Sequence, residues 1–74
     1  YASIFPNPNK GIFNIRADVN KLKIEIYSSL GQLIMNKAII NGTEQIDLSN
    51  EPQGIYFVKL IHNNEIQQTK LIIQ

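Results

Sequence analysis

Cysteine is absent from this 74-residue chain, so no disulfide supplements what must be a small core. Tryptophan is absent too, and His62 is the single histidine, which leaves a zinc or iron site almost without nitrogen or sulfur ligands. No apolar run approaches the roughly 20 residues of a membrane-spanning helix, so we expect no membrane insertion. The lack of cysteine identifies no compartment, because disulfides are a tendency of small secreted domains and not a requirement.

A charge excess of either sign is also missing. Seven basic and six acidic residues give a formal net charge of +1. The basic residues are scattered along the chain rather than gathered in one stretch. Binding to nucleic acid or to an anionic membrane requires a basic patch, so we expect neither partner.

Catalytic and cofactor-binding patterns are equally sparse. The four glycines are isolated, so none forms a phosphate-binding loop. His62 is expected at the tip of a hairpin, where it would be solvated rather than positioned as a base. Asp47, Asn50 and Glu51 could form a weak Ca²⁺ site, but oxygen-rich loops of this kind usually make turns. We therefore predict no enzyme activity, no metal and no cofactor.

What the chain has is apolar alternation with a period of two, which is typical of strands with one buried face. Phe13, Ile15 and Ala17 alternate with polar residues, and the same pattern recurs further along the chain. The predicted strands are Gly11 to Ala17, Leu22 to Ser28, Gln32 to Ile40, Glu44 to Leu48, Ile55 to His62 and Glu65 to Ile73, with a short one at Ser3 to Phe5.

Turn residues separate these strands. Ser28 to Gly31 predicts a tight hairpin turn in which Gly31 has a positive φ. Asn41-Gly42 is the strongest two-residue hairpin pattern in the chain, and His62 to Glu65 predicts another hairpin. Short strands at even spacing with short turns indicate an all-β fold, a small antiparallel β-sandwich of about seven strands in a single domain over residues 1–74.

Two predicted strands have apolar residues on both faces. Ile55, Phe57 and Ile61 lie opposite the Tyr56 face of one strand, and Ile66 and Ile72 lie opposite Leu71 in the last. Either the N-terminal segment or a loop covers this second face, or the face is an exposed apolar patch where another protein docks.

Four ordered motifs resemble a known family. The residues from Asn7-Pro8 through Gly11 to Ile15 match an NPxxGxFxI opening. Ile24 to Leu33 matches a strand that contains Ile-Tyr, followed by a turn that contains Gly-Gln. Ile46 to Ser49 followed by Gly54 to Leu60 matches I-D-L-S…GxYxVxL, and the chain closes on Lys70 to Ile73. In this order and spacing, the set resembles the type A C-terminal sorting domain of the type IX (Por) secretion system of Bacteroidetes.

The resemblance implies an immunoglobulin-like β-sandwich at the C-terminus of a larger secreted protein. It implies a non-catalytic signal that directs an upstream cargo domain from the periplasm across the outer membrane, to be secreted or held at the cell surface. The implied partners are the outer-membrane secretion machinery and a sortase-like protease that removes the domain. Two departures, Ser28 after Tyr27 and Glu51-Pro52 before Gly54, fall in loops or at their borders.

The candidate recognition residues are Lys70, Leu71, Ile72 and Ile73 at the end of the chain, and Asn7, Pro8 and Gly11 near its start. Asn7, Pro8 and Gly11 have an alternative role in shaping the backbone, and Lys70 has one as a solvated charge that discourages aggregation at a sheet edge. We predict structural roles for Gly31, Gly54 and Tyr56, with the Tyr56 hydroxyl bonded across the loop before it. The alternative function is a ligand-binding module for carbohydrate or adhesion, which the low aromatic content of 8% makes less favourable.

Overall fold

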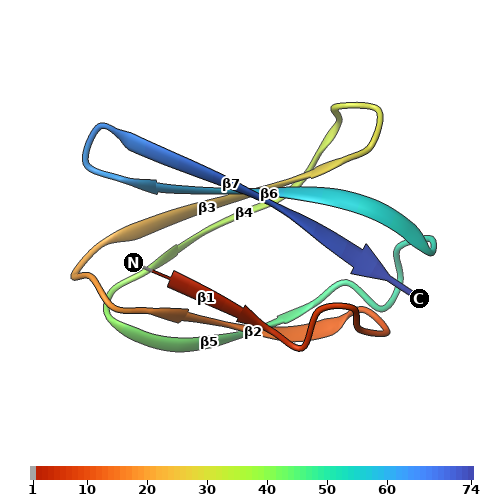
Figure 1. The fold of residues 1–74 in the computed structure, drawn as a ribbon, viewed down its shortest axis with the longest axis horizontal. Helices are drawn as coiled ribbons and strands as arrows, with labels where there is room; N and C mark the ends of the chain where they lie inside the picture. The colour runs from red at the N-terminus through yellow and green to blue at the C-terminus, as the bar shows by residue number, and fades with distance from the viewer. Residues whose placement is uncertain (1) are drawn as a thin grey trace.

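A computed structural model describes residues 2–74, and within them the chain forms seven β-strands and no helix (Figure 1). No helical segment in this range has the length and apolarity to span a membrane. The strands are β1 (Ala2–Phe5), β2 (Ile12–Ala17), β3 (Leu22–Ser28), β4 (Leu33–Ile39), β5 (Gly42–Asp47), β6 (Gly54–His62) and β7 (Glu65–Ile73).

Two antiparallel sheets face each other as the layers of a sandwich (Figure 1). One has three strands in the order β1-β2-β5, and the other has four in the order β4-β3-β6-β7. The chain passes between the layers after β2, β4 and β5, so strands that follow each other often lie in different sheets. This arrangement confirms the predicted all-β sandwich and is consistent with an immunoglobulin-like fold.

The core lies between the sheets and is made by alternate residues of the strands. Phe13 and Ile15 of β2, Ile24 and Ile26 of β3, and Val58 of β6 have no exposed surface. These residues belong to the inward faces that the period-two pattern predicts, because successive side chains of a strand point to opposite sides. The same alternation buries Tyr56, Leu60, Leu71 and Ile73 on β6 and β7.

The Asn41-Gly42 hairpin prediction is wrong. Both residues have the positive φ that such a turn requires, 66° and 114°. However, β4 and β5 do not pair, because β4 belongs to the four-stranded sheet and β5 to the three-stranded one. The turn therefore carries the chain from one layer to the other. The hairpins predicted at Ser28 to Gly31 and at His62 to Glu65 are present.

The outer face of β6 and β7 is only partly covered. Ile55 is 45% exposed, Ile66 64% and Ile72 36%, whereas Phe57 and Ile61 are half-buried. Of the two alternatives for this face, the structure favours exposure, and the N-terminal segment leaves these isoleucines accessible to solvent.

Replacement of Phe13 by alanine tests the inward face of β2. We expect Phe13→Ala to lower the free energy of unfolding by about 3–5 kcal/mol, because it leaves a cavity in the centre of the core. Phe5→Ala is the matched control: Phe5 is 44% exposed on β1, and the expected loss is about 1 kcal/mol or less. Urea unfolding of both variants measures the difference, and equal losses would show that Phe13 does not occupy the core.

Candidate functional site

The two predicted recognition segments, one near each end of the chain, lie side by side. β7 is an edge strand of its sheet. The loop from residue 6 to residue 11, between β1 and β2, runs along the last residues of β7, as Figure 1 shows below the arrowhead of that strand. We call this loop and the strand end 70–74 the terminal clamp.

The Asn7 side chain takes the place of a peptide group beside the edge. Its Nδ2 donates to the Lys70 carbonyl at 2.8 Å, and its Oδ1 accepts from the Ile72 amide at 3.1 Å. One carboxamide thus satisfies a donor and an acceptor of β7 that an edge strand would otherwise leave to water.

Asn9 continues the clamp with its backbone. Its amide donates to the Ile72 carbonyl at 3.0 Å, and its carbonyl accepts from the Gln74 amide at 2.7 Å, next to a parallel bridge to Ile73. The Asn9 side chain is buried and bonds to the Pro6 carbonyl and the Gly11 amide, at 2.9 and 2.8 Å. These internal bonds fix the loop in the shape that reaches β7. Pro8 lies between the two asparagines.

Gly11 joins the clamp to the segment that follows β5 of the three-stranded sheet. Its carbonyl accepts from the Leu48 amide at 2.6 Å. Its φ is +106°, and a Cβ added there would lie 2.8 Å from the Ser49 Cα. Both the backbone conformation and the close approach therefore require glycine. The structure gives Gly11 a packing role, and its direct recognition by a partner stays a prediction.

The four residues predicted at the C-terminal end differ in what they present. Leu71 is fully buried and Ile73 is 4% exposed, so both side chains belong to the core. Lys70 and Ile72 point outward, where a partner of the folded domain could contact them. A role for Leu71 and Ile73 is therefore to hold the strand in the sheet that displays Lys70 and Ile72.

The residues predicted to be structural lie at the other turns. Gly31 closes the β3–β4 hairpin through a bond from its amide to the Ser28 carbonyl, and Gly54 begins β6 opposite Ile73. The predicted bond of Tyr56 is present, since its hydroxyl donates to the Pro52 carbonyl at 2.6 Å. Burial, together with the charge of Glu51, raises the pKa of Tyr56 above its ordinary value and keeps the hydroxyl protonated.

The oxygen-rich loop after β5 makes a turn. Asp47 Oδ1 accepts bonds from the Ser49 hydroxyl and the Ser49 amide, and these bonds hold the pKa of Asp47 below its ordinary value. Between residues 2 and 74, no group of three or more His, Asp or Glu side chains is placed to hold a metal ion. The His62 ring lies 2.9 Å from the Lys21 carbonyl through Nδ1.

Asn9 is the residue that sequence reasoning missed. An asparagine between proline and lysine in a turn is expected to be solvated, but Asn9 is 5% exposed and is the one buried polar residue of the described chain. The available signal was its position two residues before Gly11, since asparagine side chains often bond to the backbone two residues further on.

Alanine at Gly11 tests the close approach to Ser49. Both Gly11→Ala and its control, Gly42→Ala, force a positive φ on a side chain, at a cost of about 1–3 kcal/mol. No atom lies within 4 Å of a Cβ at Gly42, whereas the Gly11 Cβ would collide with the Ser49 backbone. We therefore expect Gly11→Ala to lose a further amount of about 1–3 kcal/mol by urea unfolding. Equal losses would contradict the packing role.

Comparison with known proteins now places the chain. The family model described as the secretion system C-terminal sorting domain matches residues 3–74. A search of curated proteins finds no match. Domains of this family are generally non-catalytic and act as signals for type IX secretion. Membership implies interaction with that machinery and export across the outer membrane toward the cell surface or the medium. The resemblance predicted from the motifs is thus confirmed, and the chain belongs to the secretion system C-terminal sorting domain family of type IX secretion.

Proposed function

We propose that this domain is the C-terminal end of a larger secreted protein and that the secretion machinery recognises the terminal clamp as one folded surface. The observation that carries the proposal is the set of four hydrogen bonds by which Asn7 and Asn9 hold residues 70–74. Because the first and last motifs of the family pattern meet in these bonds, a partner that binds the strand end also contacts the loop.

We infer the route of the cargo from the family. The cargo passes from the periplasm across the outer membrane with this domain as a non-catalytic address. A sortase-like protease then removes the domain, and the cargo is released or attached to the cell surface. Support for this sequence of events comes from the family assignment over residues 3–74.

Sugar binding has less support. Carbohydrate-binding modules commonly present an open aromatic ring to the sugar. Here the Lys59 ammonium lies over the Tyr27 ring, 5.0 Å from its centroid, and the Tyr27 hydroxyl donates to Glu25 at 2.9 Å. These contacts occupy one face of that ring and its polar end.

Deletion of Leu71 to Gln74 is the direct test. A reporter cargo fused to the shortened domain should accumulate in the periplasm instead of reaching the medium or the cell surface. Fractionation and immunoblotting measure its distribution. Normal export of the shortened fusion would show that the terminal strand is not the signal.

A milder variant separates the clamp from the core, since the deletion also removes two buried side chains. Asn7→Asp keeps the acceptor for the Ile72 amide but loses the donor to the Lys70 carbonyl and places a carboxylate beside it. We expect a loss of about 0.5–1.5 kcal/mol in unfolding free energy and reduced export. Asn64→Asp makes the same chemical change in the exposed β6–β7 turn and should leave both unchanged.

A further inference from the structure

Within residues 2–74, the first half of the β7 edge carries main-chain groups that no strand pairs. The clamp bonds involve residues 70, 72 and 74, so the even-numbered residues of β7 direct their amides and carbonyls away from β6. β7 pairs with β6 in an unbroken register from Glu65 to Ile73. Because backbone direction alternates along a strand, Ile66 and Gln68 also direct both groups outward, and Lys70 directs its amide outward.

This half of the strand also protrudes from the sandwich. Each residue from Glu65 to Gln68 is exposed, on both faces of the strand, whereas the second half contributes Leu71 and Ile73 to the core. In Figure 1 the β6–β7 turn, at the upper left, lies apart from the three-stranded sheet at the bottom. An approaching strand would therefore meet no obstruction from the other layer.

The other edge strands are less available. β1 has four residues, against nine in β7. β4 and β5 are the edge strands on the opposite side of the sandwich, and the ion pair between Lys37 and Glu44, at 2.9 Å, links them across the layers. An added strand at either would have to accommodate this link.

The charged side chains on the outer face of β6 and β7 indicate which charge a partner strand should carry. Lys59 and Lys70 project from β6 and β7 on that face. The ion pairs of the described residues join Arg16 to Asp18, Lys23 to Glu25 and Lys37 to Glu44, and Lys70 takes part in none of them. Glu25, the acidic residue opposite Lys59, is already bonded to Lys23 and Tyr27. The strip beside the edge therefore attracts carboxylates.

We propose that the edge from Ile66 to Lys70 binds an extended strand of another protein, with acidic side chains on the face that meets Lys70. Only a polypeptide backbone supplies alternating donors and acceptors at the spacing that Ile66 and Gln68 present. The partner strand adds to β7 where the loop of the terminal clamp stops. This inference rests on the proposed function in one respect, namely that the partner strand belongs to the secretion machinery.

A second copy of the domain is a poorer occupant. A symmetric antiparallel pairing centred on Gln68 would bring two copies of Lys59 and two of Lys70 onto one continuous face. In this register Lys70 lies opposite Ile66 of the second copy and neither lysine meets a carboxylate, whereas an acidic strand at the same place pairs with these lysines.

Titration with blocked heptapeptides tests the site on the 74-residue chain. The probe Thr-Glu-Thr-Val-Thr-Glu-Thr reads the same in both directions, and Thr-Lys-Thr-Val-Thr-Lys-Thr is its charge-reversed partner. Amide NMR shifts should move at Ile66, Gln68 and Lys70, and the acidic peptide should bind about three- to tenfold more tightly. Absence of shifts at these amides with several millimolar peptide, or equal binding of the two peptides, would overturn the proposal.

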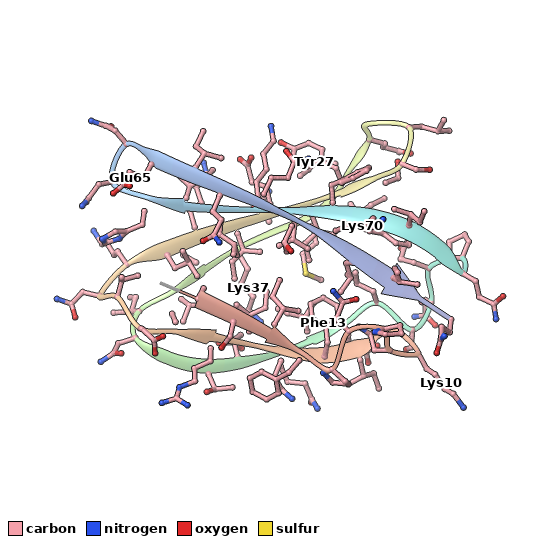
Figure 2. The ribbon with its side chains drawn as sticks, viewed as in Figure 1. Lys10, Phe13, Tyr27, Lys37, Glu65 and Lys70 are labelled. Atoms are coloured by element: carbon pink, nitrogen blue, oxygen red, sulfur yellow. The ribbon has the colours of Figure 1, made fainter. Side chains whose placement is uncertain are left out.

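Two variants sharpen the result. Gln68→Pro removes an outward amide without breaking a bond to β6 and should abolish binding. Lys70 projects from β7 (Figure 2), and Lys70→Glu should reverse the preference between the two peptides. Arg16→Glu, the same charge change on β2 of the other sheet, should not. Undiminished binding by Gln68→Pro, or an unchanged preference in Lys70→Glu, would contradict the site.

Export of a fused cargo separates this inference from the proposed function. We expect Gln68→Pro, which lies outside the terminal clamp, to reduce export while its melting temperature stays close to that of the parent domain. If Gln68→Pro is exported normally but deletion of Leu71 to Gln74 blocks export, the terminal clamp is the signal and the edge inference fails. If the deletion is exported normally, the proposed function fails, and the peptide titration still decides whether the edge binds a strand.

Discussion

The last strand of the sandwich is hydrogen-bonded on both sides over its final residues, and the rest of the site depends on that constraint. β6 pairs with β7 along its whole length, and the Asn7–Asn9 segment pairs with residues 70–74 from the other side. An edge strand at the end of a small domain would otherwise fray. Here the side chains of Leu71 and Ile73 are buried, and the outward backbone groups from the Lys70 carbonyl to the Gln74 amide are bonded, so these last residues are held in place.

This constraint links stability to recognition. Gly11 connects the loop to the Leu48–Ser49 segment, which follows β5 of the other sheet, and Asn9 connects the loop to β7. The loop therefore bridges the two layers at the point where the chain ends. A change in either layer that moves the loop would also alter the surface formed by Lys70 and Ile72, so the proposed recognition would depend on residues near both ends of the domain.

The sequence was sufficient to predict the strands and their buried faces, because side-chain alternation is a local property that is visible in Phe13, Ile15 and Ala17. It was insufficient for the pairing of β4 and β5. Asn41 and Gly42 adopt the positive φ expected of them, but the same local turn serves a hairpin or a crossing between layers, and tertiary packing decides. The two predicted recognition segments, one near each end of the chain, were identified independently of each other. Their meeting through Asn9 depends on a contact between residues more than 60 positions apart, which no local pattern encodes.

Hydrogen exchange of the β7 amides tests the central claim most directly. Ile66, Gln68 and Ile72 all direct their amides away from β6, but only the Ile72 amide has a partner, the Asn7 side chain. The account predicts that the Ile72 amide exchanges much more slowly than those of Ile66 and Gln68, in spite of its place near the end of the chain. Exchange of Ile72 as fast as that of Ile66 and Gln68 would show that the terminal clamp does not form in solution.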